Sequence, residues 1–508
     1  MTYQTLTAGP LRADYGHGHL RYVRRGDDEV LRMIYVAFRD RDWRTARINR
    51  TTETIEQTAD SFRVRYDWQT DDFGMAMTGR VEIIGAPDGT ITFDLTGEAL
   101  ADFEKNRIGL CVLHPLDGTV GQPAEVSSLT GEQGMGHFPT YIQPDQPFRN
   151  IEQFRWQSRS KRSYRLIFAG DVFEMEDQRN WTDASFKTYS TPVDLPKPVR
   201  VAKGDTFHQR VTLAPDHSVT EWPSAQDLPQ PESNPAHRPR VGVGQRADGV
   251  PLTPAEANAL RSLGLSHLRA DVFLTDADWQ PRLSGAIADA NALNVPLELA
   301  VFFGPSPETD LAKLLTVDDL GPKTIGWVAL FEAATLTTSD ALLQTVVPKL
   351  RTAWPGIPIG GGTDANFAEF NRNPFDYTLV DFVTYPANPQ VHAVDDLTLT
   401  ENIAGQPHTV RTARYRSGGK PVHVSPVMLL PRQITLAGAA DERKTAPVDI
   451  RYYTPFTADW TRQSLRALTD AGADHITYYE THGPAGLLAG DTIYPVYATL
   501  HEFLHDRS

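Results

Sequence analysis

Hydrophobic and polar residues alternate with a period of two through much of the first part of the chain. Residues 62–68 place aromatic and branched side chains on one face and charged ones on the other, which is typical of a half-buried antiparallel strand. Residues 80–84 and 90–96 flank Asp88-Gly89, which predicts a hairpin because a tight turn needs positive φ angles. Further strands are predicted at residues 164–168 and 207–213. Since helical periodicity is nearly absent, we predict an N-terminal β-sandwich domain over residues 1–214.

A proline-rich stretch, residues 215–239, ends this pattern. It carries six prolines among polar residues, a composition that neither a helix nor a central strand tolerates. These prolines are Pro215, Pro223, Pro229, Pro231, Pro235 and Pro239. The stretch therefore predicts a stiff, extended linker between two domains, and a chain of 508 residues also favours two domains.

After the linker, short apolar runs alternate with helical patterns. The candidate strands are residues 240–245, 267–272, 296–303, 324–332, 358–362, 381–385, 421–428 and 475–480. The helices between them have recognisable ends. Thr253 and Glu256 form a capping box, and Gly264 ends that helix. A later helix at residues 461–470 ends in the same way at Gly472.

Strand–helix units repeated over residues 240–508 predict a (β/α)8 barrel, whose usual size is ~250 residues. An open, doubly wound sheet is the alternative. Against it, the turn Val243-Gly244-Gln245-Arg246 after the first strand lacks the third glycine of a dinucleotide-binding fingerprint. The sequence thus predicts a C-terminal TIM barrel preceded by an all-β domain.

Composition limits the binding partners and the cellular compartment that we expect for this protein. The formal net charge is -15, whereas nucleic acids and anionic membranes attract clustered Lys and Arg, so we expect neither as a partner. The single cysteine, Cys111, excludes an intrachain disulfide and lies in an apolar run, which indicates a core position. The N-terminus lacks a signal-peptide pattern, and no run approaches the roughly 18 apolar residues of a membrane span. We expect a cytoplasmic protein.

Residues 174–189 read E-M-E-D-Q-R-N-W-T-D-A-S-F-K-T-Y and show neither strand nor helix periodicity. Surface loops are usually built from Gly, Pro, Ser and Asn, but this stretch is aromatic and carries charges of both signs. It therefore indicates a substrate-binding segment, and we expect it to reach over the carboxyl ends of the barrel strands. Its candidate binding residues are Glu176, Asp177, Arg179, Asn180, Trp181 and Asp183.

Together with N-R-I-G-L-C-V-L-H-P at residues 106–115 and I-T-Y-Y-E-T at residues 476–481, this stretch resembles the D-apionate lactonase family of bacterial sugar catabolism. The resemblance runs over nearly the whole chain. It implies a carboxylic ester hydrolase that opens D-apionolactone to D-apionate, with a small sugar lactone as the ligand. It supplies no catalytic residues, which are therefore argued from chemistry.

Active sites of barrels lie at the carboxyl ends of the strands, and the predicted strand ends are unusually polar. The candidates there are Arg269, Asp271, Glu332, Asp364, Asn366, Tyr385, Asn388, His392, Tyr479, Glu480 and His482. Burying so many polar groups without a ligand would be costly, so their convergence indicates a site. Glu332 and Glu480 are the leading carboxylates, and Glu369 is interpreted as a surface or capping residue.

Several mechanistic classes can be compared. A serine hydrolase of the nucleophile-elbow type needs G-x-S-x-G, which does not occur in the sequence. Only His392 and His482 are plausible imidazole ligands, so neither a metal nor another cofactor is predicted. A retaining glycosidase needs two carboxylates about 5 Å apart. Glu332 and Glu480 could form such a pair, which keeps a glycoside hydrolase as the alternative function.

A lactonase needs a base for water, donors for the oxyanion and an acid for the leaving oxygen. Glu480 or Glu332 would activate water. We expect Glu480 to share one face of the last strand with Ile476 and Tyr478; if that face is inward, Glu480 and Glu332 repel each other and one of them acquires a raised pKa. The other roles would fall to Arg179, Asn180 or Asn366 for the oxyanion, to His392 or Tyr385 for the leaving oxygen, and to Trp181 for stacking on the sugar. A carbohydrate-binding protein without activity is the third possibility.

Overall fold

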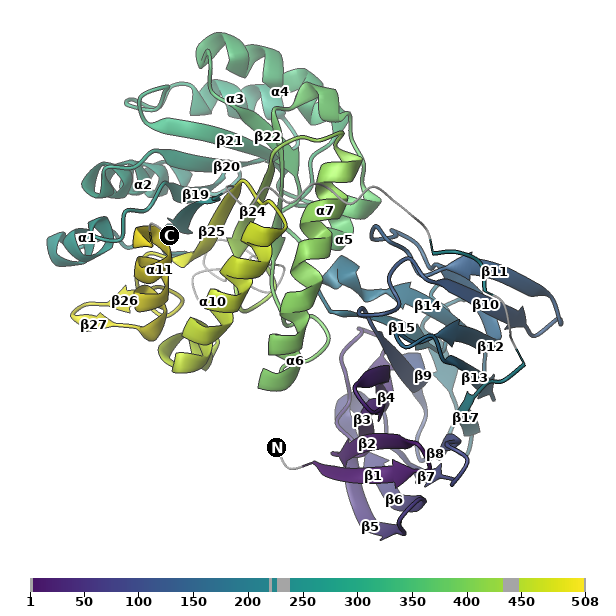
Figure 1. Ribbon diagram of the computed structural model, residues 1–508. Coiled ribbons are helices and arrows are strands. Elements are labelled where there is room, and N and C mark those ends of the chain that lie inside the picture. The colour runs from purple at the N-terminus through teal and green to yellow at the C-terminus, as the bar shows by residue number, and fades with distance from the viewer. Residues whose placement is uncertain (1–2, 219–221, 226–237, 433–446, 507–508) are drawn as a thin grey trace. The chain divides into compact units, whose positions relative to one another are not determined.

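The computed structural model describes residues 3–218, 222–225, 238–432 and 447–506 (Figure 1). The chain divides into two compact units. One contains the chain up to Gln178 and again from Ser185, and the other contains Arg179–Ala184 and the chain beyond the proline-rich stretch. Of that stretch, Pro215 is the last residue of a strand, whereas Pro229, Pro231 and Pro235 lie outside the described residues.

The first unit is built from antiparallel strands. These are β1 (Gln4–Ala8), β2 (Leu11–Gly16), β3 (His19–Arg25), β4 (Asp28–Asp40), β5 (Asn49–Gln57), β6 (Phe62–Thr70), β7 (Met77–Gly85), β8 (Ile91–Ala99), β9 (Phe103–Pro115), β10 (Pro123–Ser128), β11 (Gln133–His137), β12 (Phe148–Gln157), β13 (Ser163–Ala169), β14 (Phe173–Asp177), β15 (Ser185–Tyr189), β16 (Val199–Val201) and β17 (Thr206–Pro215). Two short 3-10 turns, η1 (Asp72–Gly74) and η2 (Gln178–Trp181), interrupt them.

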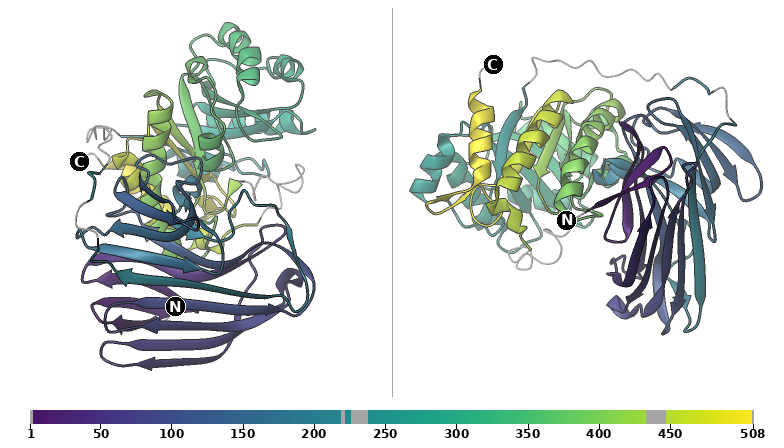
Figure 2. Two further views of the ribbon diagram at one scale, coloured as in Figure 1. Left: turned by 90° about the vertical axis from the view of Figure 1, so that its right-hand side faces the viewer. Right: turned by 60° about the horizontal axis from the view of Figure 1, so that its bottom comes forward.

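These strands pair as one continuous 17-stranded sheet that folds into two layers (Figure 2). One follows β1-β2-β3-β4-β9-β15-β14 and the other β5-β6-β7-β8-β17-β13, and β12 pairs with both β13 and β14. Phe38 of the first layer and Trp68 of the second are buried with ring centroids 4.8 Å apart. The hydrophobic faces therefore pack against each other, which confirms the predicted β-sandwich.

The local patterns were confirmed as well. Buried residues alternate with more exposed ones along β6. β7 and β8 form the predicted hairpin, with Gly89 at φ +91 in its turn, a conformation that glycine adopts without steric cost. Cys111 is buried in β9.

The second unit contains a closed barrel of eight parallel strands that pair in chain order. The strands are β18 (Arg240–Gly244), β19 (Leu268–Phe273), β20 (Leu297–Phe303), β21 (Ile325–Glu332), β22 (Ile359–Gly362), β23 (Phe382–Ala387), β24 (Val422–Val427) and β25 (His475–Glu480). The closed pairing confirms the (β/α)8 barrel and excludes the open doubly wound sheet.

Helices follow the strands and cover the outside of the barrel (Figure 1). They are α1 (Pro254–Arg261), α2 (Trp279–Leu293), α3 (Pro307–Leu314), α4 (Asp340–Ala353), α5 (Phe367–Arg372), α6 (Asp396–Glu401), α7 (Gln406–Arg416), α10 (Pro455–Asp470) and α11 (Pro495–His505). Shorter elements are η3 (Tyr377–Leu379), η4 (Asn402–Gly405), η5 (Ile450–Tyr453), β26 (Leu488–Ala489) and β27 (Thr492–Ile493). The predicted capping box of α1 is present. None of the described helices is long and apolar enough to cross a membrane.

Side-chain direction along the barrel strands decides which residues reach its interior. On β21, Trp327, Ala329 and Phe331 belong to one buried cluster with Phe302 of β20. Because successive side chains of a strand point to opposite faces, Glu332 points to the outside of the barrel, toward the helices.

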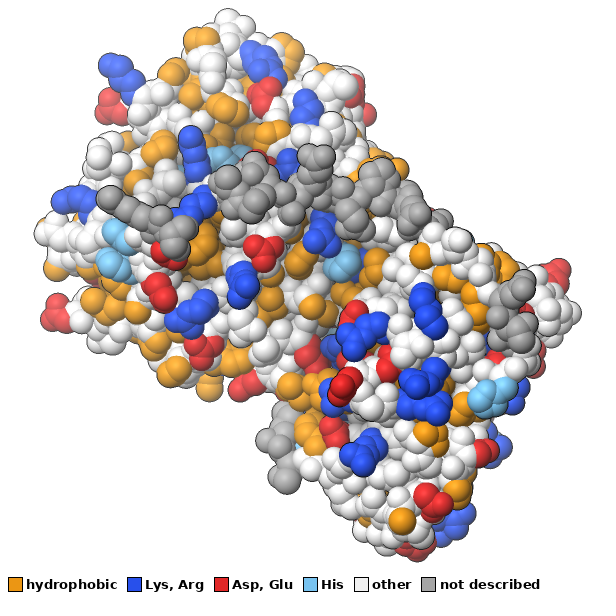
Figure 3. Space-filling model, viewed as in Figure 1, with side chains coloured by type: hydrophobic (Ala, Val, Ile, Leu, Met, Phe, Trp, Pro, Cys, Tyr) orange, Lys and Arg blue, Asp and Glu red, His pale blue; other side chains and the backbone are white. Residues whose placement is uncertain are grey.

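Acidic and basic side chains are interspersed on the face drawn in Figure 3. Among the described residues of that face, no large patch of one sign is visible.

Candidate functional site

A cavity of about 180 Å³ opens at the carboxyl ends of β18, β19, β24 and β25. It is smaller than the roughly 300–1,000 Å³ of pockets for drug-sized ligands, so it suits a small molecule. Its charged and hydroxyl-bearing lining residues are Arg246, Asp248, Arg269, Asp271, Arg282, Arg432, Tyr452, Tyr479 and Glu480.

A β-bulge in the last strand sends Tyr478 and Tyr479 to the same side. Across β18 and β25, Gly242 lies opposite Thr477 and Gly244 lies opposite Glu480, so two residues of β25 match a single residue of β18. Tyr479 has a φ of +53. A bulge of this kind interrupts the alternation of side chains and redirects those that follow it.

The hydroxyl contacts show the result of the bulge. Tyr478 and Tyr479 bind Ser464 and Thr461 of α10, at 2.8 and 2.7 Å, so both rings point outward. Glu480 is thereby turned into the cavity. The prediction that Glu480 shares one face with Ile476 and Tyr478 was therefore wrong, because regular alternation does not survive the bulge.

Glu480 has the electrostatics of a proton-transfer residue. Burial raises its pKa from 4.5 to about 7, and the charge of Asp248 adds to this. The backbone N–H of Ala247 and the charges of Arg432 and Arg246 act in the opposite direction. A carboxyl group with a pKa near neutrality can both accept and return a proton, and perturbed groups of this kind gather at functional sites.

The loop after β18 holds the partners of Glu480 in place. Arg246 and Asp248 form an ion pair at 2.8 Å. Arg282 Nη2 donates to the carbonyl of Ala247 at 2.5 Å. Since the N–H of the same residue donates to Glu480, Arg282 fixes the loop that carries this donor.

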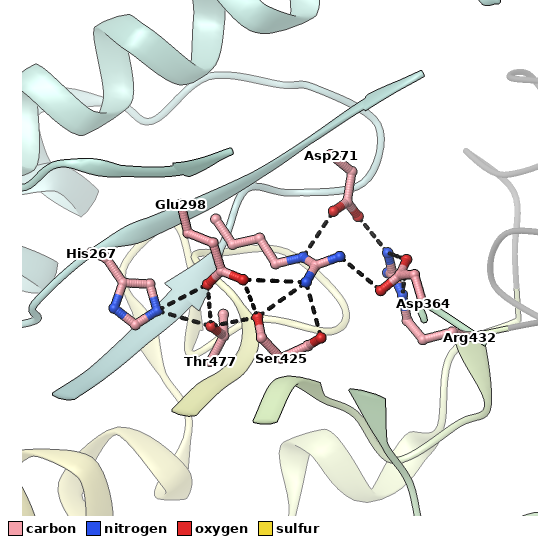
Figure 4. A network of polar contacts seen from close by, with 8 residues as sticks. His267, Asp271, Glu298, Asp364, Ser425, Arg432 and Thr477 are labelled. Carbon is pink, nitrogen blue, oxygen red and sulfur yellow. Dashed lines mark hydrogen bonds and ion pairs between the residues drawn. The ribbon is translucent and has the colours of Figure 1, made fainter. Parts of the chain in front are cut away.

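Two arginines and two aspartates form a ring beside Glu480 (Figure 4). Arg269 donates to Asp271 at 2.8 Å and to Asp364 at 2.7 Å. Arg432 donates to Asp271 at 2.5 Å and to Asp364 at 2.7 Å. Positive and negative groups alternate around this Arg–Asp ring, so its buried charges compensate one another.

Further polar residues inside the barrel support the ring (Figure 4). Arg269 also donates to Glu298 at 3.3 Å. Glu298 accepts from the hydroxyls of Ser425 and Thr477, at 2.5 and 2.6 Å, and lies 3.2 Å from His267. Burial opposes the charge of Glu298, but His267 and Arg269 outweigh it and lower its pKa. Glu298 is thus a buried, ionised anchor for Arg269.

Glu332, the second predicted catalytic carboxylate, is not among the described residues that line the cavity. It accepts from the hydroxyls of Ser339 and Thr335, next to the start of α4. The structure therefore does not bring Glu332 and Glu480 together at this cavity.

Residues Arg179–Ala184 pack within the second unit, in what we call the 179–184 cluster. Asp183 accepts from Asn402 at 2.7 Å and also binds His392. Trp181 meets the ring of His392 edge-on, with centroids 6.0 Å apart. Further contacts of the cluster join Arg179 to His408 at 3.1 Å and Asn180 to Asn371 at 2.9 Å. None of these residues lines the cavity described above.

The remaining predicted site residues lie in other settings. Asn366 caps α5 in a capping box with Glu369, which confirms a capping role for Glu369, and Asn388 donates to Asn366 at 3.4 Å. The hydroxyl of Tyr385 lies 2.9 Å from that of Thr409. In the first unit, Glu176 pairs with Lys187 at 3.6 Å, and Asp177 accepts from the backbone of Gln143 at 3.1 Å.

Of the predicted residues, the cavity gathers Arg269, Asp271, Tyr479 and Glu480. Sequence reasoning missed Arg246, Asp248, Arg282, Arg432 and Tyr452. Arg246 and Asp248 could have been found, because they directly follow the first barrel strand and the strand-end rule applies to them. Arg432 lies only a few residues after β24, so the same rule could have reached it. Tyr452 lies far beyond β24 in sequence, where no local signal points to the site.

No group of three or more His, Cys, Asp or Glu side chains gathers as metal ligands would anywhere in the described chain. Among the residues that line the cavity, Glu480 carries a carboxyl group whose pKa lies near neutrality, with arginine side chains around it.

A closed (β/α)8 barrel, with a cavity at the carboxyl ends of its strands that contains a buried carboxyl group, defines the class: a TIM-barrel protein of enzyme type with an additional β-sandwich domain. Family models for the N-terminal domain and the TIM barrel domain of D-apionate lactonase match residues 1–218 and 241–507. The chain belongs to the D-apionate lactonase family. The D-apionate lactonase of Brucella anthropi is 30% identical, over 96% of this chain and 83% of that protein.

Similarities to solved structures are more remote. A family 39 glycoside hydrolase from Bacteroides cellulosilyticus WH2 is 11% identical, with a TM-score of 0.37 over 80% of each chain. A β-glucuronidase from Ruminococcus gnavus in complex with D-glucaro-d-lactam is 9% identical, with a TM-score of 0.37 over 91% of this chain and 69% of that one. At these scores neither similarity bears on the chemistry.

Proposed function

We propose that this protein hydrolyses a sugar lactone, D-apionolactone, to D-apionate, with Glu480 as its acid–base residue. Family membership supports the reaction, because the Brucella anthropi relative is named for it. The observation that carries the proposal is the position of Glu480, which a β-bulge turns into the cavity and whose pKa is about 7.

In the proposed reaction, the Glu480 carboxylate takes a proton from a water molecule as the water oxygen attacks the lactone carbonyl. The carbonyl oxygen becomes an oxyanion in the tetrahedral intermediate. The bond from this carbon to the ring oxygen then breaks, and protonated Glu480 returns its proton to that oxygen. The product is the open hydroxy acid, which ionises in water. General acid–base catalysis of this kind contributes roughly 10²- to 10⁴-fold.

Tyr452 and Arg432 are the proposed donors to the oxyanion. The Tyr452 oxygen accepts the backbone N–H of Leu429 at 3.1 Å. Burial raises the pKa of Tyr452 well above its usual value, so the phenol keeps its proton and can donate it as a hydrogen bond. Arg432 lines the same cavity wall and offers guanidinium N–H donors there. Donors fixed in advance toward a developing negative charge stabilise the transition state.

This scheme changes several roles expected from the sequence. Asp183 and His392 bind each other, and Tyr385 binds Thr409. We therefore assign the proton transfer to the leaving oxygen to Glu480 rather than to His392 or Tyr385. Tyr452 and Arg432 replace Arg179, Asn180 and Asn366 as the oxyanion donors, because they line the cavity that Glu480 enters.

The test is a substrate panel with the full chain. D-apionolactone, other hydroxylated γ-lactones and aryl glycosides are incubated separately, and ring opening is followed by the fall in pH or by the loss of the lactone carbonyl absorbance. We expect lactones to be opened and aryl glycosides to remain intact. Cleavage of aryl glycosides without lactone turnover would establish the glycoside hydrolase alternative, and binding without any turnover would indicate a carbohydrate-binding protein.

A further inference from the structure

Asp271 and Asp364 hold equivalent places in the Arg–Asp ring but differ in their surroundings. Each accepts hydrogen bonds from both Arg269 and Arg432. The Asp271 side chain is 24% exposed and lines the cavity, whereas that of Asp364 is 0% exposed and does not. The same hydrogen-bonding pattern therefore presents one carboxylate to a ligand and keeps the other in the protein interior.

The exposed carboxylate still has acceptor capacity. An ionised carboxylate offers about four lone-pair sites. Oδ1 of Asp271 accepts from Arg269 and Oδ2 accepts from Arg432, which leaves acceptor sites that the arginines do not use. Burial opposes the charge of Asp271, but the two arginines outweigh it and lower its pKa. The ionised Asp271 carboxylate can therefore only accept hydrogen bonds, and hydroxyl groups are the ligand groups that suit it.

The charges of the ring favour a neutral ligand. Each guanidinium of the ring is matched by two carboxylates, and Arg269 also contacts Glu298 and the backbone carbonyl of Ser425. A carboxylate on the ligand would gain little from cations that are already compensated, and it would be repelled by Asp271.

We propose that Asp271 determines substrate specificity by accepting hydrogen bonds from the hydroxyl groups of a neutral polyhydroxylated lactone, and that Asp364 is a structural member of the ring. This inference rests on the proposed lactone hydrolysis. Asp271 thereby selects hydroxylated lactones against unsubstituted ones, and neutral lactones against those that carry a carboxylate.

The ring itself supplies a matched pair of variants, Asp271→Asn and Asp364→Asn. Each removes one negative charge from the ring with almost no change in shape. We measure kcat/KM for D-apionolactone and for γ-butyrolactone, which lacks hydroxyl groups, together with the thermal midpoint. Asp271→Asn should lower the preference for the hydroxylated lactone by roughly 10- to 100-fold, the factor expected for a hydrogen bond to a charged group. Asp364→Asn should lower the thermal midpoint while the preference stays within about threefold.

An unchanged preference in Asp271→Asn, or an equal loss of preference in both variants, would overturn the inference. If Asp271→Asn does not fold, Asp271→Glu keeps the charge and moves the carboxylate by one methylene, and the same loss of preference is expected.

Calorimetric binding of a stable lactam that carries the same hydroxyl groups distinguishes a failure of the proposed lactone hydrolysis from a failure of the proposed role of Asp271. Absence of lactone turnover by the unchanged chain contradicts the proposed function, whereas lactam binding weakened equally by both Asn variants contradicts only the role of Asp271. A lactone bearing a carboxylate should bind more weakly than the neutral one, and tighter binding would count against the inference.

Discussion

The cavity around Glu480 and the 179–184 cluster are both rich in polar side chains, but they differ in what those side chains contact. Glu480 faces an open cavity, and burial brings its pKa to about 7. In the 179–184 cluster, Asp183 binds both His392 and Asn402. A cluster of polar residues can therefore either face a ligand cavity or hold parts of the chain together. The presence of a cavity beside the cluster distinguishes these two cases.

Replacing Glu480 should give the largest effect. Glu480→Gln keeps the shape of the side chain and removes the base, so we expect kcat to fall by roughly 10²-fold or more in a variant that remains folded. In the unchanged chain, kcat/KM should rise with pH through about 7 as Glu480 ionises. Steady-state kinetics on D-apionolactone between pH 5 and 9 check both expectations.

Glu332→Gln is the matched control, because it makes the same change at a strand end that does not line the cavity. Its kcat should stay within about threefold of the original. A fully active Glu480→Gln would remove this residue from the mechanism, and an inactive, folded Glu332→Gln would restore the two-carboxylate scheme.

The 179–184 cluster should respond in stability rather than in rate. Asp183→Ala leaves the buried Asn402 and the half-buried His392 without their acceptor, so we expect the free energy of unfolding to fall by about 1–3 kcal/mol. Denaturant unfolding measures this loss. Asp459→Ala, which removes an exposed ion pair to Arg462, should cost less than about 1 kcal/mol. A large loss of kcat in a stable Asp183→Ala would assign catalysis to the cluster.

A smaller, pH-dependent effect should distinguish Glu480 from other carboxylates. Its pKa is about 7 in the folded chain, against 4.5 for an ordinary glutamate. Between these values the folded chain holds a proton that the unfolded chain has released, so the contribution of Glu480 to stability is lost as pH rises through this window. The thermal midpoint of Glu480→Gln should therefore increase relative to the unchanged chain from pH 4.5 to about 7 and then level off. A constant difference across this range would show that the pKa of Glu480 is not raised.

Chelation should have the smallest effect. Since the described residues include no group of three or more metal-ligating side chains, lactone turnover should be unchanged after exhaustive dialysis against EDTA. Loss of turnover that Zn²⁺ or Mn²⁺ restores would contradict this and would require new roles for Asp271 and Glu480.

The sequence alone determined the two kinds of architecture. Period-two alternation in strands such as β6 and the repeated strand–helix pattern after the linker are local properties, because they follow from which face of each element is buried. The strand-end rule also led directly from the barrel to Arg269, Asp271 and Glu480. These residues lie where the fold class alone places them.

Only the tertiary structure decided which of the polar candidates meet. The inward turn of Glu480 depends on the bulge at Tyr479, which arises from pairing between β25 and β18, strands at opposite ends of the barrel sequence. Arg432 joins Asp271 and Asp364 across the barrel, and Asp183 meets His392 although they are far apart in the chain. The direction of a side chain depends on register and on partners distant in sequence, and neither is encoded in the residues next to it.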